Sequence, residues 1–66
     1  MNTIINGTEK IISDNLSITG LLDELKINAA TVVIEKNSII VDKTAYSLER
    51  VNEGDKIEII RFMGGG

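Results

Sequence analysis

The chain has 66 residues, 42% of them hydrophobic, with a net charge of -3 and neither cysteine nor histidine. This length supports one small domain, and the composition excludes disulfides, thiolate metal sites and the commonest general base. Because the 10 acidic residues outnumber the 7 basic ones without any basic run, the sequence predicts no nucleic-acid partner. No apolar run approaches the roughly 18 residues of a membrane span, and no signal peptide is recognisable, so we expect a cytoplasmic protein without a membrane partner.

The N-terminal segment predicts a β-hairpin. Residues 3–5 and 10–12 have strand-like composition and flank the pair Asn6 and Gly7. Asn-Gly suits the positive φ angles of a tight hairpin turn. The sequence therefore predicts that the fold opens with two antiparallel strands.

A helix is predicted after the hairpin. Ser17 is a favourable N-cap residue, because its hydroxyl can accept a hydrogen bond from a backbone N–H of the first turn. The apolar residues that follow, Ile18, Leu21, Leu22 and Leu25, have the spacing of one helix face. We therefore predict an amphipathic helix over residues 18–26.

The remainder of the chain predicts three more strands. These cover residues 31–35, 39–41 and 56–62, with a helical turn at 42–47 and a Gly-Asp turn at 52–55. The predicted order is ββαβββ. It corresponds to an α+β fold in which one main helix covers one face of a mixed sheet of four to five strands.

One helix covers one sheet face and leaves the other to water or to a partner. By the two-residue period of a strand, Ile60 and Phe62 point away from the helix, and so does Ile4 in the first strand, where Thr3 and Ile5 face the core. The outward residues are either covered by loops, exposed individually as many apolar residues are, or part of a docking patch beside the C-terminus.

The chain ends on Gly64, Gly65 and Gly66, directly after Met63. Without Cβ atoms these residues are thin enough to enter a narrow channel, and four extended residues span at most about 14 Å. A glycine-rich terminus without a function is the alternative interpretation. We divide the chain into a domain over residues 1–62 and a flexible C-terminal tail over residues 63–66, whose useful group is the terminal carboxylate.

Together these features resemble the ubiquitin-like β-grasp superfamily over the whole chain. Within it the chain is most similar to the sulfur carrier proteins of thiamine biosynthesis. The similarity rests on the short length, the opening Ile4-Ile5-Asn6-Gly7, the stretch from Asn52 to Ile59 and the ending Met63-Gly64-Gly65-Gly66.

The resemblance implies a carrier rather than an enzyme. In that family an E1-like adenylating enzyme uses ATP and Mg²⁺ to activate the C-terminal carboxylate. Sulfur from a cysteine desulfurase or another source then forms a thiocarboxylate, which thiazole synthase uses. Because this chain has no phosphate-binding loop and no candidate metal site, the nucleotide and metal are expected to belong to the partner. The resemblance assigns modification to Gly66 and tail threading to Gly64 and Gly65. The strand pattern, together with the position beside the tail, predicts partner docking through Ile4, Ile60, Phe62 and Met63.

Several alternatives stay open at this point. The small subunit of molybdopterin synthase also carries a C-terminal thiocarboxylate, but it is usually longer and more proline-rich before its glycines, whereas this chain has no proline. A ubiquitin-like modifier or a tRNA-thiolation carrier would differ in the molecule that receives the carboxylate or the sulfur. A plain interaction module with an accidental tail is a fourth interpretation. An autonomous enzyme is disfavoured, because nothing in the sequence resembles a nucleophile with its base.

Overall fold

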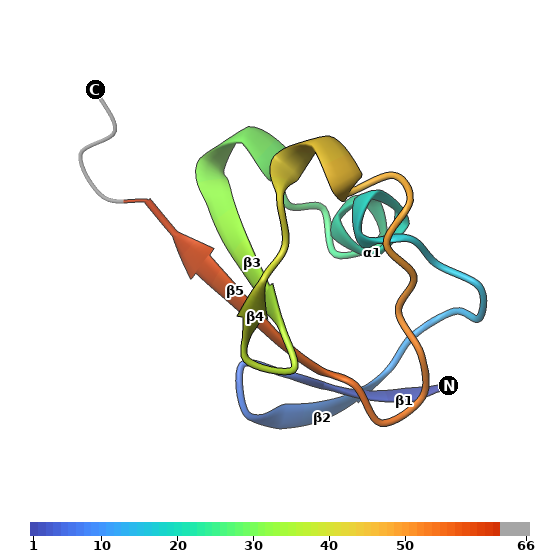
Figure 1. Ribbon diagram of the computed structural model, residues 1–66. Helices are drawn as coiled ribbons and strands as arrows, with labels where there is room; N and C mark the ends of the chain where they lie inside the picture. Colours follow the sequence, from blue (N-terminus) through green and yellow to red (C-terminus); the bar gives the residue numbers. More distant parts are fainter. Residues whose placement is uncertain (63–66) are drawn as a thin grey trace.

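The computed structural model describes residues 1–62, shown in Figure 1. The elements in chain order are β1 (Asn2–Ile5), β2 (Thr8–Ile11), α1 (Ile18–Glu24), the 3-10 helix η1 (Ala29–Thr31), β3 (Val32–Lys36), β4 (Ile39–Ile40), the 3-10 helix η2 (Lys43–Ala45) and β5 (Lys56–Arg61). The five strands form one sheet in the order β2-β1-β5-β3-β4. Strands β1 and β5 run parallel, and the other neighbours run antiparallel. The predicted ββαβββ order is confirmed.

The opening hairpin forms at the predicted turn. Asn6 and Gly7 adopt φ angles of 50° and 81°, as a two-residue type I′ turn requires. Because the turn has only two residues, Ile5 pairs directly with Thr8. The second strand therefore begins at Thr8, two residues earlier than predicted. The β3–β4 turn also has two positive φ angles, 52° at Asn37 and 73° at Ser38.

Helix α1 begins as predicted but ends earlier. The Ser17 side chain accepts a hydrogen bond from the Gly20 N–H at 3.0 Å. The helix ends at Glu24 instead of reaching Lys26, because Lys26 adopts a left-handed φ of 60°. The Lys26 and Ile27 N–H groups bond to the carbonyls of Asp23 and Leu22 at 3.1 and 2.9 Å. These two bonds form a Schellman motif, with lysine at the position that usually holds glycine.

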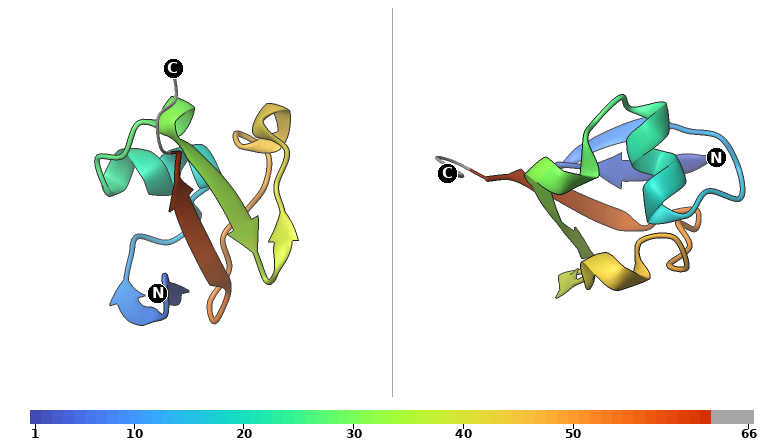
Figure 2. Two further views of the ribbon diagram at one scale, coloured as in Figure 1. Left: turned by 90° about the vertical axis from the view of Figure 1, so that its left-hand side faces the viewer. Right: turned by 90° about the horizontal axis from the view of Figure 1, so that it is seen from above.

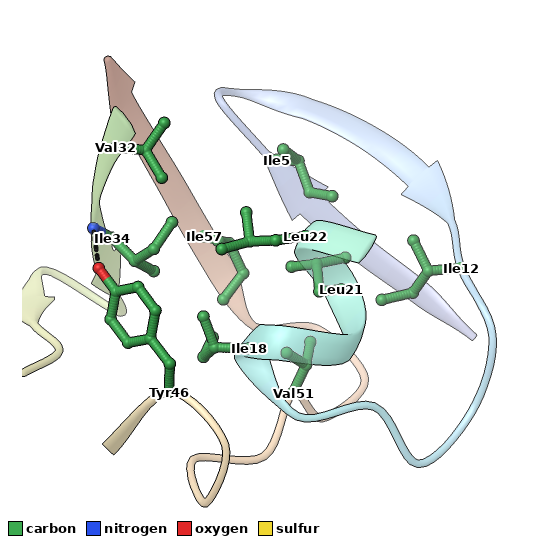
Figure 3. Packing of buried hydrophobic residues seen from close by; sticks show 10 residues of the cluster. All are labelled: Ile5, Ile12, Ile18, Leu21, Leu22, Val32, Ile34, Tyr46, Val51 and Ile57. Atoms are coloured by element: carbon green, nitrogen blue, oxygen red, sulfur yellow. Dashed lines mark hydrogen bonds between the residues drawn. The ribbon is translucent and has the colours of Figure 1, made fainter. Parts of the chain in front are cut away.

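The core lies between α1 and the sheet face that it covers (Figures 2 and 3). Its ten buried hydrophobic residues are Ile5, Ile12, Ile18, Leu21, Leu22, Val32, Ile34, Tyr46, Val51 and Ile57. Thr3 is also buried, and its side-chain oxygen has no hydrogen-bond partner within residues 1–62. The burial of Thr3 and Ile5 shows that both face the core, as predicted. Tyr46, the residue after η2, accepts a hydrogen bond on its hydroxyl from the Ile34 N–H at 3.2 Å.

The long connection between η2 and β5 is held by a lysine that is largely buried. Lys36 Nζ donates to Glu49 Oε2 at 2.9 Å and to the Arg50 carbonyl at 2.7 Å. The Asp55 carboxylate lies 3.7 Å from the same nitrogen. The hydrogen bond to Glu49 is the largest of the interactions that raise the pKa of Lys36.

Gly54 in the predicted turn has a φ of 83°. Of the helices within residues 1–62, none has the length and apolar character to cross a membrane.

Candidate functional site

Helix α1 covers one face of the sheet and leaves the opposite face uncovered (Figure 2). Strand β5 presents apolar side chains on that uncovered face. Ile57 is fully buried, whereas Ile60 and Phe62 are 45% and 46% exposed. Val33 lies directly opposite Ile60 in the antiparallel register of β3 and β5, so the two side chains share the outer face. We call Val33, Ile60 and Phe62 the outer patch. It lies at the end of the described chain, immediately before the predicted tail.

The structure separates Ile4 from this patch. Ile4 is half-buried and lies on the outer face, as predicted, but its partner on β5 is Lys56. Lys56 precedes Ile60 by four residues, which corresponds to about 13 Å along a strand. The three predicted docking residues of the described chain therefore share a face, but only Ile60 and Phe62 lie together. Met63 and Gly64–66 lie outside the described residues, and all the predicted docking and tail roles stay predictions.

Two contacts fix the position of Phe62. Its N–H donates to the Thr31 carbonyl at 3.0 Å, which extends the β3–β5 pairing by one residue beyond Arg61. The Lys43 ammonium lies 5.0 Å from the centre of the Phe62 ring, within the range of a cation–π contact. Sequence reasoning missed both Lys43 and Val33. Neither carries a recognisable signal, because their proximity to the patch depends on strand order and register.

Two acidic residues lie beside the outer patch on β3 and β5. Glu35 and Glu58 lie directly opposite each other on β3 and β5, an arrangement that destabilises a strand pair. Within residues 1–62, neither forms a salt bridge, and no group of three or more potential metal-ligating side chains occurs. The pKa of Glu24 is lowered by hydrogen bonds from Ser13, and the pKa of Asp42 by those from Thr44. Neither set of hydrogen bonds involves a residue of the outer patch.

A groove opens on the other side of the sheet, between the β1–β2 hairpin and the segment that follows α1. Its volume is about 570 Å³. The lining is formed by Ile5, Asn6, Thr8, Lys10, Leu25, Ile27, Val32, Ile59 and Arg61. Because Arg61 is the last residue of β5, the groove and the outer patch approach the same end of the domain from opposite faces. Sequence reasoning did not anticipate this groove.

The five-stranded mixed sheet with one helix on one face defines the protein as a ubiquitin-like β-grasp domain. A solved structure supports this assignment: the crystal structure of the thiamine biosynthesis protein (ThiS) from Geobacter metallireducens matches with a TM-score of 0.88 and 35% sequence identity, over 100% of both chains. The fold prediction is therefore confirmed.

The family model of the ThiS family matches residues 3–66, and the chain belongs to this family of sulfur carriers of thiamine biosynthesis. The sulfur carrier protein ThiS of Bacillus subtilis is 33% identical over 63 residues, covering 94% of this chain and 96% of the relative. A thiazole synthase of Paramagnetospirillum magneticum is 42% identical over 66 residues, which are 100% of this chain but 20% of that relative. The chain thus spans a small part of the thiazole synthases that it matches. The resemblance inferred from the sequence is confirmed.

Proposed function

We propose that the chain carries sulfur for thiazole formation as a thiocarboxylate at Gly66. A partner adenylating enzyme supplies ATP and Mg²⁺, and the carboxylate attacks the α-phosphorus of ATP with loss of pyrophosphate. A persulfide on the sulfur donor then attacks the acyl carbon and displaces AMP. A thiol reduces the resulting S–S bond, which leaves the thiocarboxylate. Thiazole synthase finally takes the sulfur, and the chain itself catalyses none of these steps.

The observation that carries this proposal is the extent of the family match. It reaches Gly66 and so includes the terminal glycines. The similarity of the whole chain to part of two thiazole synthases supports thiazole synthase as the enzyme that receives the sulfur. The position of the outer patch is consistent with this role, because an enzyme docked on Ile60 and Phe62 would hold the start of the tail. Docking on a rigid face offsets part of the entropy lost when a tail is ordered.

Intact mass spectrometry tests the chemistry. Incubation with an adenylating enzyme, ATP, Mg²⁺, a cysteine desulfurase and cysteine should increase the mass by the difference between sulfur and oxygen. Addition of thiazole synthase with its other substrates should then restore the original mass. Reversal by a molybdopterin precursor and its synthase instead would indicate the molybdopterin branch.

The tail is tested by Gly65→Val, which should prevent sulfur loading by widening the segment and restricting its backbone, while the fold stays intact. Normal thiocarboxylate formation by this variant would contradict the steric role of the glycines. Circular dichroism spectra of the two proteins provide the control for folding.

The outer patch is tested by Phe62→Asp, which should weaken binding to the adenylating enzyme without unfolding the domain. Leu48→Asp is a matched control, because Leu48 is also exposed, at 76%, but lies outside the sheet. Equal affinities of the two variants, measured by isothermal titration calorimetry, would argue against docking through this patch.

A further inference from the structure

The backbone groups of β5 alternate between its two neighbouring strands. The Phe62 N–H bonds to the Thr31 carbonyl on the β3 side. On the β1 side, the Ile59 N–H bonds to Asn6 Oδ1 at 2.7 Å, and the Ile59 carbonyl accepts from Asn6 Nδ2 at 3.3 Å. Because the direction of these bonds reverses at each residue, the N–H and C=O of Arg61 point towards the β1 side.

No strand occupies that side next to Arg61. The pairing of β1 with β5 ends at Ile5, which lies beside Ile57, and the turn at Asn6 then takes the chain away. Figure 2 shows β3 along one side of β5, whereas the β1–β2 hairpin lies on the other side. Within residues 1–62, the pairings of β1 place no residue beside Arg61, and none of the hydrogen bonds outside the sheet ladders involves the Arg61 backbone. Strand β5 therefore has an open edge beyond Asn6.

The groove described above lies beside this open edge. Its apolar lining includes Leu25, Ile27 and Ile59, and Lys10 and Arg61 supply its two positive charges. The chain as a whole has a net charge of -3, so this positive charge is a local feature. An extended peptide that continued the sheet beside Arg61 would place alternate side chains in the groove.

We propose that this edge is a strand-addition site for an extended segment of thiazole synthase. The segment pairs its backbone with that of Arg61, continues the sheet where β1 stops, and carries aliphatic side chains into the groove with an acidic side chain facing Lys10 and Arg61. The inference rests on the proposed function, since it makes thiazole synthase the partner. Backbone pairing recognises a strand without using side chains, which suits a chain that continues into glycines. Complementary charge adds specificity and speeds association.

Amide hydrogen exchange of the unmodified protein tests the site directly. In the free chain the Arg61 amide should exchange fast and the Phe62 amide slowly, because only the latter is hydrogen-bonded. On addition of thiazole synthase, exchange of the Arg61 amide should slow by about tenfold or more, with the reaction quenched in acid and read by NMR. A protected Arg61 amide in the free chain, or unchanged exchange in the complex, would overturn the proposal.

Two substitutions at one position isolate the backbone bond. Arg61→Gln and Arg61→Pro both remove the charge, but only proline removes the N–H donor. Because this N–H does not bond to β3, both variants should keep the fold, which the melting temperature checks. Arg61→Pro should bind thiazole synthase about 2- to 10-fold more weakly than Arg61→Gln, the effect of one hydrogen bond. Equal affinities would refute strand addition.

The charge complementarity is tested at a second position. Lys10→Glu should also weaken binding. Arg50→Glu should leave it unchanged, because Arg50 pairs with Ser17, before α1, and does not line the groove. If Lys10→Glu binds thiazole synthase with normal affinity, the proposal that the partner segment carries an acidic side chain is refuted. The proposed carrier function has its own test: it is refuted if deletion of Gly65 and Gly66 leaves sulfur transfer intact. If only the substitutions at Arg61 and Lys10 have no effect on binding, the strand-addition site is refuted and the carrier function is not.

Discussion

Thr3→Val is expected to stabilise the domain. Thr3 is 1% exposed in the middle of β1, and within residues 1–62 its hydroxyl oxygen has no hydrogen-bond partner. An unpaired buried hydroxyl costs about 1–3 kcal/mol, and valine replaces it with a methyl group of similar shape and retains the preference for a strand. The free energy of unfolding should therefore rise by about 1–3 kcal/mol. For a domain of this size each kcal/mol shifts the melting temperature by about 4–8 °C.

Thermal and urea unfolding followed by far-ultraviolet circular dichroism measure this effect. Thr3→Ser is the first control, because it keeps the hydroxyl and removes the methyl group, and it should destabilise the domain. Thr8→Val is the second control, because Thr8 is exposed on β2, and its effect should stay within about 0.5 kcal/mol. A Thr3→Val protein no more stable than the wild type would show that the hydroxyl is satisfied in solution, and the reasoning would be refuted.

Three further substitutions test the helix end, the loop anchor and an exposed carboxylate. Lys26→Gly should raise the free energy of unfolding by up to about 1 kcal/mol in urea titrations, because Lys26 has a φ of 60°; Lys26→Ala should not. Lys36→Met should lower the free energy of unfolding by about 1–3 kcal/mol, because it removes the hydrogen bond to Glu49. Since the pKa of Lys36 is raised, the stability difference between the wild type and Lys36→Met should persist below the ordinary lysine pKa and shrink as the pH rises through the raised pKa. Glu24→Gln should destabilise the protein at neutral pH, and the difference should vanish as the pH falls through the lowered pKa of Glu24; urea midpoints across pH measure both effects.

Local signals predicted most of the fold. The pair Asn6-Gly7 specified the first turn, and Ser17 specified the start of the helix, because both depend on interactions within a few residues. The end of α1 was predicted wrongly for a related reason. Helix ends are usually recognised from glycine, whereas here Lys26 occupies the left-handed position and nothing in its side chain indicates it. The hydrogen bonds of Lys26 and Ile27 to the last turn stabilise that conformation.

The composition of the candidate site depended on pairing between distant strands. The alternation of β5 was enough to predict that Ile60 and Phe62 face outwards. Whether Val33 or Ile4 lies next to Ile60 depends on strand order and register, which a single sequence does not reveal. The register pairs Val33 with Ile60 and Ile4 with Lys56. This is why the sequence predicted the correct face but grouped Ile4 with residues that lie further along β5.

Asn6 shows how one residue links the first turn to the open edge of β5. Its positive φ ends β1, a role that the Asn-Gly pair reveals in the sequence. Its side-chain amide also bonds to both backbone groups of Ile59, a contact between residues 53 positions apart that no local pattern indicates. Asn6 therefore ends β1 and provides hydrogen bonds to the Ile59 backbone on that side of β5. The Arg61 backbone is the next position on the same edge, and it is available to pair with another strand. Because an open edge at this point continues directly into the tail, the hairpin turn determines where a partner strand can begin to pair.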